Sequence, residues 1–401
     1  MVSQTSRAEE TRSWFSPGVA GIGGASLLAD IGHEIPTALL PSLLTGFGAP
    51  AAALGVIEGI ANGAAGIARL AGGPIADDPE RRRAAALGGY TATAVLSALI
   101  GAATATWQVG ILRVGAWTSR GLRVPARNAL LADIVSPEAY GRAYGFERAM
   151  DNLGAIVGPL LALILVGVLG TRTTILLSVI PGLLAAAAIL FATRQAPRLS
   201  TRNRTSIRLA FKPVFRGPLG RLFIGISAFE MGNVATTLLI LRATQALTPT
   251  HGQVVATEIA LGMYVAYNVA ATLVSVPAGH VNDRRGPVLV LAVGALLFCA
   301  ADLGFAIASL PSLAVAFVLA GIAIGCIETA QHAAVATLAP PDIRGSAFGV
   351  LAAAQSFGNF AASAVAGLQW TFVSPFAAFL YLAFWMLVGA GVTIRARAGA
   401  H

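Results

Sequence analysis

The sequence predicts an all-α membrane protein with twelve transmembrane helices, arranged as two pseudo-symmetric six-helix bundles. Composition points there first, because 56% of the 401 residues are hydrophobic and only 11% are charged, whereas a soluble domain carries about 25% charged residues. The apolar stretches are also long enough to cross a bilayer, which takes about 20 residues per helix. The low share of charged residues excludes a soluble enzyme. The 45 glycines have no period, which excludes a fibrous chain, and the 2 cysteines are too few for a disulfide-stapled domain.

The apolar stretches give the expected spans in order. They lie near 18–45, 51–76, 84–105, 107–133, 144–168, 173–193, 220–243, 257–281, 287–309, 312–337, 346–368 and 373–394. These stretches are too long for strands of a membrane barrel, and they do not alternate in polarity as such strands do. The sequence therefore predicts helices, and their even number places both termini on the same side of the membrane.

Arginines between the spans set the expected orientation. They occur in alternate turns, at Arg81, Arg82, Arg83, Arg142, Arg284, Arg285, Arg344, Arg395 and Arg397, with Arg172 as the clear exception. Basic turns face the cytoplasm, so both termini are expected inside. A bacterial inner (plasma) membrane is the expected location.

A basic segment divides the chain. From Arg194 to Arg221 there are eight basic residues and no acidic one. We interpret residues 195–219 as a cytoplasmic linker that rests on anionic lipid headgroups. The expected domains are a first bundle at 1–194, this linker, and a second bundle at 220–401.

An internal repeat supports two related halves. The pattern Gly-x-x-x-Asp occurs at Gly73–Asp77 and again at Gly279–Asp283, an offset of 206 residues, and each copy is followed by arginines. A second pattern, Pro-(Glu/Asp)-x-x-Gly-x-Ala-x-Gly, begins at Pro137 and at Pro341, an offset of 204. Two unrelated motifs at nearly one offset indicate a duplication, which is a transporter architecture. The glycines allow close helix contact, and the aspartates are expected to hold a cytoplasmic gate; the alternative is a static helix cap.

These motifs resemble the major facilitator superfamily of transporters. The family's cytoplasmic motif has the form Gly-x-x-x-Asp-Arg-x-Gly-Arg-Arg, which Gly279–Gly286 matches well. The first copy departs from it, with Asp78 and Glu80 in place of an Arg and a Gly. The stretches Leu54–Ala61, Arg113–Asp133 and Arg148–Pro159 are similar to a poorly characterised prokaryotic subgroup. The resemblance covers the whole chain and implies transport by alternating access. The expected gating residues are Gly73, Asp77, Arg81, Arg82, Gly279, Asp283, Arg284, Arg127 and Asp151.

Charged side chains inside spans are costly and are functional candidates by default. Asp30, His33 and Glu34 share one helix face through their i, i+3, i+4 spacing. A rise of 1.5 Å per residue places Asp30 ~10 Å below the outer face of the membrane core, Glu58 ~12 Å and Arg113 ~9 Å below it. The three groups are therefore expected at one level. The resemblance implies that the first and fourth spans line the cavity and that Arg113 takes part in proton coupling; the alternative is a static ion pair.

The remaining candidates lie deeper or in the second half. Arg120, Arg123, Arg127, Asp133, Glu147, Arg148 and Asp151 are interpreted as structure of the inner gate. In the second half, Glu328 is the first site candidate and Glu230 the next, each with amide neighbours. Packing is the alternative role of Glu328.

The function predicted from the sequence is secondary active transport, as proton-coupled efflux (antiport) of a small molecule. Uptake by a uniporter or proton symporter is the second interpretation, and a non-transporting receptor or scaffold the third. No enzyme activity, cofactor or bound metal is expected, because nucleophile, phosphate-loop and metal-ligand patterns are missing. The expected partners are the substrate, protons and the lipid bilayer, without nucleic acid, and the protein is expected to be a monomer.

Overall fold

A computed structural model describes residues 14–196 and 211–398, and the described part is helical without strands. The helices in the first part of the chain are α1 (Pro17–Gly46), α2 (Ala51–Asp77), α3 (Pro79–Leu99), α4 (Thr106–Ile134), α5 (Tyr140–Leu177) and α6 (Val179–Gln195), with short 3-10 turns at Ile100–Ala102 and Pro137–Ala139. Those after residue 210 are α7 (Phe211–Val214), α8 (Gly217–Glu230), α9 (Thr236–His251), α10 (Gln253–Arg285), α11 (Pro287–Ile307), α12 (Leu310–Leu338), α13 (Arg344–Phe372) and α14 (Pro375–Ala398).

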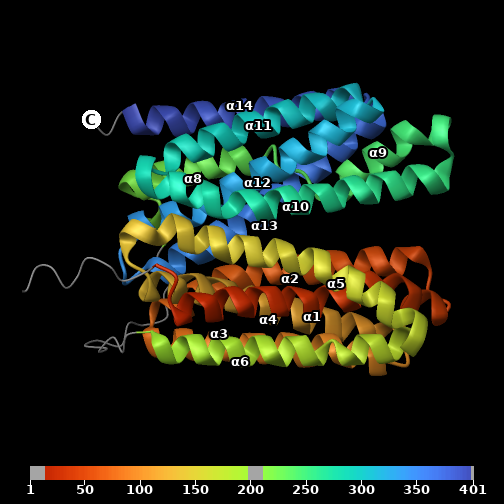
Figure 1. Ribbon diagram of the computed structural model, residues 1–401, viewed down its shortest axis with the longest axis horizontal. Coiled ribbons are helices and arrows are strands. Elements are labelled where there is room, and N and C mark those ends of the chain that lie inside the picture. Colours follow the sequence, from red (N-terminus) through yellow and green to blue (C-terminus); the bar gives the residue numbers. More distant parts are fainter. Residues whose placement is uncertain (1–13, 197–210, 399–401) are drawn as a thin grey trace, which may run out of the picture.

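The long helices run side by side in two layers (Figure 1). We call α1–α6 the first bundle and α8–α14 the second bundle. The start of α1 and the end of α14 lie at the same end of the molecule, which we call the arginine-rich end because Arg81–Arg83, Arg142, Arg284 and Arg344 lie there. Residues 197–210, most of the expected linker, lie outside the described residues, so the domain boundaries stay a prediction.

The twelve expected spans correspond to these helices with two adjustments. Gly170 has a φ of 76° inside α5, a left-handed conformation that glycine adopts without a Cβ clash. The chain turns there, so the fifth span ends before Gly170 and the sixth continues through α6. Seven helical segments of the described chain are long and apolar enough to cross a membrane. Those outside this set are α1, α2 and α4, which carry internal charges, and the α8–α9 pair, of 14 and 16 residues.

The seventh span differs from its expected form. One helix was expected near 220–243, but α8 ends at Glu230 and α9 begins at Thr236. The freed backbone groups find partners on α13, because Asn359 donates to the Asn233 carbonyl at 2.8 Å and Ala235 donates to Ser363 Oγ at 2.9 Å. A helix break inside a membrane protein is tolerated when neighbours satisfy its backbone in this way.

Glycines bring the two bundles into contact at the arginine-rich end. A Cβ on Gly73 of α2 would lie 2.9 Å from the Ser346 Cα of α13, and a Cβ on Gly279 of α10 would overlap the Gly141 backbone of α5. Toward the other end of α2, Gly55, Gly59 and Gly63 have no neighbouring atom within 4 Å of such a Cβ. The bundles therefore touch along α2 and α13 at one end and separate toward the other.

Replacing Gly279 with alanine should destabilise the contact between the bundles. The added methyl group meets backbone on α5, and overpacking of this kind costs about 1–3 kcal/mol. The matched control is Gly262→Ala on the same helix, where a Cβ meets open space and alanine gains about 0.5–1 kcal/mol of helix stability. Thermal unfolding in detergent should show a lower midpoint only for Gly279→Ala; equal midpoints for both variants would contradict the contact.

Candidate functional site

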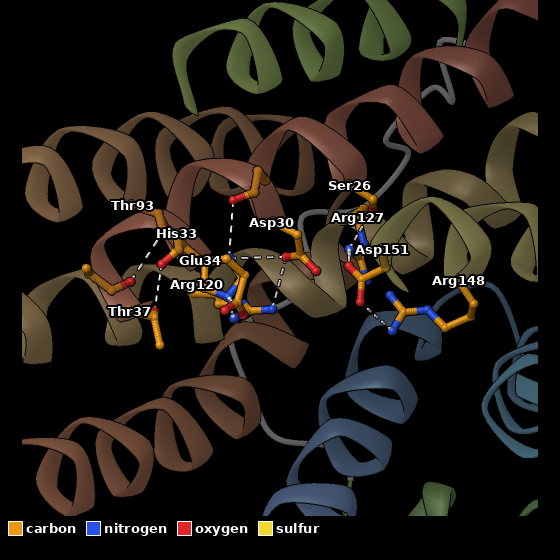
Figure 2. Close-up of polar contacts among 12 residues, drawn as sticks. Ser26, Asp30, His33, Glu34, Thr37, Thr93, Arg120, Arg127, Arg148 and Asp151 are labelled. Carbon is orange, nitrogen blue, oxygen red and sulfur yellow. Dashed lines mark hydrogen bonds and ion pairs between the residues drawn. The ribbon is translucent and has the colours of Figure 1, made fainter. Parts of the chain in front are cut away.

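A buried polar cluster joins α1 to α4 in the middle of the first bundle (Figure 2). On α1, His33 Nδ1 lies 3.2 Å from Asp30 Oδ1, and His33 Nε2 lies 3.1 Å from Glu34 Oε1. From α4, Arg120 reaches Asp30 Oδ1 at 3.2 Å and His33 Nε2 at 2.5 Å. The i, i+3, i+4 spacing on α1 and one cation from α4 therefore gather four titratable groups at one place.

His33 Nε2 has two partners that require opposite hydrogen-bonding roles of it. Toward Arg120 it must be an acceptor, because a guanidinium only donates, and toward the Glu34 carboxylate it must be a donor. The neutral ring with its proton on Nδ1 satisfies Arg120, and the protonated ring satisfies Glu34. The protonation state of His33 therefore decides which of the two contacts is favourable.

A second ion pair lies next to this cluster. Arg113 of α4 is 1% exposed at its side chain and contacts Glu58 Oε1 of α2 at 2.8 Å, and it donates to Thr37 Oγ1 of α1 at 3.0 Å. Its guanidinium stacks 3.5 Å from the centre of the Trp117 ring, and the Trp117 indole donates to Asn62 at 3.1 Å. This pair ties α1, α2 and α4 together.

The ion pairs in the structure differ from the grouping that was expected from the depth of these charges. Depth along the helices placed Asp30, Glu58 and Arg113 together, and the structure pairs Arg113 with Glu58, while Asp30 pairs with Arg120. Trp117 joins the two pairs, since the His33 ring packs edge-on against it at 5.4 Å. Arg120, interpreted from the sequence as inner-gate structure, belongs to the Asp30 cluster. Its position seven residues after Arg113, on the same face of α4, was the available signal.

A third group of charges lies toward the arginine-rich end, between α4 and α5. Arg127 contacts Glu147 at 2.7 Å and Asp151 at 3.6 Å, and Arg148 contacts Glu147 at 2.7 Å and Asp151 at 3.2 Å. Glu147 is 1% exposed and also accepts from Ser26 of α1 at 2.5 Å. Removing one member of such a buried network leaves an uncompensated charge, so the network fixes the packing of α1, α4 and α5.

Two contacts extend this polar region into the second bundle. Arg148 Nη1 lies 3.7 Å from Glu328 Oε2 of α12. Arg69 of α2 donates to Ser356 Oγ and to the Ala352 carbonyl of α13. Glu328 therefore faces the first bundle, and the polar site spans both bundles.

Glu230 lies at the end of α8, and its hydrogen-bond partners are neutral amides. Its carboxylate accepts from Asn233 at 2.9 Å and from Gln331 of α12 at 3.2 Å. Gln355 of α13 donates to Gln331 at 2.8 Å. Glu230 and Glu328, expected together as second-half candidates, thus have different partners.

The repeated aspartates both reach across to the opposite bundle. Asp77 at the end of α2 accepts from the Ser346 backbone N–H in the first turn of α13 at 2.8 Å. Asp283 near the end of α10 accepts from the Gly141 and Arg142 backbone N–H groups in the first turn of α5, at 2.6 and 3.1 Å. A carboxylate at a helix N-terminus satisfies free N–H groups and interacts favourably with the helix dipole.

The basic members of the expected gate have mixed roles. Arg82 pairs with Asp133 of α4 and donates to the Ala76 carbonyl at 2.6 Å, so it holds α2, α3 and α4 together. Arg81 is 3.8 Å from Asp78, which caps α3. Arg284 lies in the last turn of α10, while Asp283 takes Arg142 of the first bundle as its side-chain partner at 2.8 Å. Within the described residues no group of three His, Cys, Asp or Glu could hold a metal ion.

The Arg113–Glu58 pair should show strong thermodynamic coupling. Arg113→Ala leaves the Glu58 carboxylate, which is 29% exposed, without its partner. Losing one partner of a fully buried pair costs about 3–5 kcal/mol, and the exposure of Glu58 makes the loss smaller here. The double variant Arg113→Ala/Glu58→Ala leaves no unpaired charge, so its unfolding midpoint should exceed that of Arg113→Ala. Thermal unfolding of the four proteins in a double-mutant cycle measures this, and additive effects would contradict the pairing.

Comparison with known proteins identifies the family of this chain. The sequence profile of the Major Facilitator Superfamily matches residues 22–256 and 222–398. An uncharacterised MFS-type transporter of Methanocaldococcus jannaschii is 29% identical over 364 residues, which cover 90% of each chain. An uncharacterised protein of Mycobacterium tuberculosis is 29% identical over 346 residues, which cover 84% of this chain and 82% of that protein.

Solved structures share the fold. The human organic anion transporter MFSD10 superposes with a TM-score of 0.72 at 18% identity, over 94% of this chain and 99% of its own. The proton:xylose symporter XylE gives 0.71 at 17% identity, over 94% and 95%. A bacterial homologue of the iron transporter ferroportin, in an outward-facing state, gives 0.70 at 14% identity, over 95% and 99%. With the profile match over most of its length, the chain belongs to the major facilitator superfamily and is a multi-pass membrane transporter of a small molecule, not an enzyme.

Proposed function

We propose that the protein exports a small molecule in exchange for protons, by alternating access between the two bundles. The observation that carries this proposal is the double demand on His33 Nε2, which lies within reach of both Arg120 and Glu34. A proton bound at His33 removes the acceptor that Arg120 uses and creates a donor for Glu34. Proton binding would therefore replace one of the two Arg120 contacts that join α4 to α1 by a contact within α1, leaving Arg120 on Asp30 alone. A weaker α1–α4 contact in the protonated state would couple the proton to a conformational change.

Exchange also requires that proton and substrate exclude one another. Glu34 and Glu58 are the members of the first-bundle site with the most accessible carboxylates, at 26% and 29% side-chain exposure. A carboxylate that holds a proton no longer attracts a polar or cationic group of a substrate. We assign coupling and substrate contact to Asp30, His33, Glu34, Glu58 and Arg113. Arg120 is the cation of the Asp30 and His33 cluster, and Glu328 is the contact from the second bundle.

Gating is assigned to the arginine-rich end, which we place in the cytoplasm by the positive-inside rule. Asp77 and Asp283 hold α13 and α5 through their N-terminal backbone groups, and Gly73 and Gly279 allow the close approach. Opening this end would break both carboxylate contacts, and Arg69 would release α13. Arg127 and Asp151 belong to the charge network between these contacts and the middle of the bundle. We place the protein as a monomer in a bacterial inner membrane, with both termini inside.

Uptake of a metabolite by uniport or proton symport is the second candidate. Arg69 favours it, because no acid of the described residues forms an ion pair with this guanidinium, and an anionic substrate would supply the missing charge. The direction of proton movement separates the two candidates.

Replacing Asp30 with asparagine should abolish proton exchange. Compounds that raise the unfolding midpoint of the purified protein are added to everted membrane vesicles with an acidic interior, reported by a quenched acridine dye. An antiporter releases interior protons when the compound is added outside, so fluorescence recovers. Asp30→Asn removes the negative charge that pairs with Arg120 and His33 and should reduce this recovery at least tenfold. Glu258→Gln, a change at an exposed acid on α10, should retain it. If the flux of the compound does not depend on the proton gradient, the proposed coupling is wrong. If the wild-type protein shows no recovery of fluorescence, uptake is favoured over export.

Neutralising the gate aspartates should open the arginine-rich end. A cysteine at the fully buried Ala76, in a background without Cys299 and Cys326, reports opening through its rate of reaction with a maleimide. A helix-capping carboxylate contributes about 1 kcal/mol, so Asp283→Asn or Asp77→Asn should raise the rate roughly fivefold. Asp78→Asn is the control, since Asp78 caps α3 within its own bundle. If Asp78→Asn raises the reaction rate by the same factor, the gate assignment is wrong.

A further inference from the structure

Arg172 is a cation at the end of the first bundle opposite the arginine-rich end, where the positive-inside rule predicts few cations. Residues 35–57, 84–112 and 152–193, which include the three turns at this end, contain no other charged residue. The Arg172 side chain is exposed, and none of the described acids forms an ion pair with it. This end of the first bundle therefore carries one positive charge that no acid of the described chain balances.

Neutral groups hold the Arg172 guanidinium in place. Its Nη1 donates to the Ala103 carbonyl at 2.8 Å and to the Gly101 carbonyl at 3.5 Å, both in the turn between α3 and α4. The guanidinium also lies 5.3 Å from the centre of the Phe47 ring, in the turn between α1 and α2. These contacts orient the side chain without neutralising it, and they leave the N–H groups of Nε and Nη2 available to another partner.

A groove lies beside the same turn. Its volume is ≈ 340 Å³, and its walls are mostly apolar, with Leu99, Trp107 and Ile111 among the lining residues. These three side chains are 42%, 65% and 63% exposed. A volume of this size is at the lower end of the range of ligand pockets, about 300–1,000 Å³. Ala103 also lines the groove, and because its carbonyl binds Arg172, the positive charge lies at the edge of the groove.

The groove runs from the level of the lipid headgroups into the hydrocarbon. α4 begins one residue before Trp107, and tryptophan is enriched where headgroups meet hydrocarbon. Ile111 lies one helical turn deeper. At the upper level, Gln108 also lines the groove, and its Oε1 accepts from the Thr104 backbone N–H at 2.7 Å, so its NH₂ group remains a donor for another partner. Donors therefore border the upper part of the groove, and apolar walls line the lower part.

We propose that the groove and Arg172 form a binding site for an anionic phospholipid. One acyl chain lies along Trp107 and Ile111, and the headgroup phosphate accepts from Arg172 and Gln108. An arginine suits a phosphate because its fork of N–H groups can donate two parallel hydrogen bonds, and basic pockets between transmembrane helices bind anionic headgroups. A neutral apolar molecule would fill the groove but leave the charge of Arg172 unbalanced. The site goes beyond the proton exchange proposed above and does not depend on it.

Lipid binding is tested on the purified full-length protein in a neutral detergent, by native mass spectrometry with phosphatidylglycerol or phosphatidylcholine of identical acyl chains. The wild-type protein should bind phosphatidylglycerol about fivefold more tightly, the contribution expected of one arginine near an anionic lipid. Arg172→Gln should abolish this preference, and Arg242→Gln should keep it. Arg242 is the matched control, because it also donates to two backbone carbonyls, those of Phe305 and Ala306 at 2.9 and 3.0 Å, but in the second bundle.

A second variant tests the groove itself. Ala102 lines the groove at an exposed position, so Ala102→Phe fills the groove without a change in charge and should weaken the binding of phosphatidylglycerol; unchanged affinity overturns the proposal, also where Arg172→Gln does not fold.

Three further results would overturn the proposal. The first is equal affinity of the wild-type protein for the two lipids, and the second is a loss of the preference in Arg242→Gln. The third is a different occupant: either glycerol phosphate, which has no acyl chain, displaces phosphatidylglycerol at equal concentration, or the protein forms a dimer without bound lipid. Asp30→Asn should bind phosphatidylglycerol as the wild-type protein does, so a failure of the proton-exchange mechanism and a failure of the lipid site are distinguishable.

Discussion

The structure depends on the requirement that charges inside hydrocarbon find an opposite charge within the protein. In the first bundle, arginines of α4 and α5 meet acids on α1, α2 and α5, and these contacts fix how each helix is rotated about its axis. Leucine and alanine surfaces of α1 and α4 would tolerate many rotations, because lipid tails compete equally well for apolar surface. The ion pairs remove this freedom, and they leave the more accessible acids, Glu34 and Glu58, facing the site.

The two bundles are joined by contacts of two kinds. At the arginine-rich end, aspartates bind the main chain of the opposite bundle. Nearer the middle, the side chains of Arg69 and Arg148 reach α13 and α12. In the proposed mechanism, substrate or proton binding would change the middle contacts first, because those contacts involve the assigned site residues. The end contacts would then set how far the equilibrium must shift before the molecule opens.

Much of this architecture follows from the sequence. Hydropathy predicts the spans, and the repeat predicts the paired aspartate contacts at one end. Helix spacing places Asp30, His33 and Glu34 on one face. Depth arithmetic predicts the level of Arg113 but not its partner, because rise per residue carries no information about direction around the bundle. Arg120 was misplaced for the same reason. The helix break after Glu230 was not predicted, because a hydropathy average over a whole span does not register the local effect of Gly232 and Asn233.

Asp77 and Asp283 bind backbone N–H groups of the opposite bundle, and one side chain adds to each contact, the Ser346 hydroxyl for Asp77 and the Arg142 guanidinium for Asp283. The start of α5 must also stay small, because a Cβ on Gly141 would overlap the Gly279 carbonyl and lie 2.6 Å from Asp283 Oδ1. The residues that follow each aspartate in the repeat are not part of these contacts, which accounts for a first repeat with Asp78 and Glu80 in its second half that still reaches the opposite bundle as the second does. The charge of this surface can therefore change during evolution while the contact between the two bundles is kept.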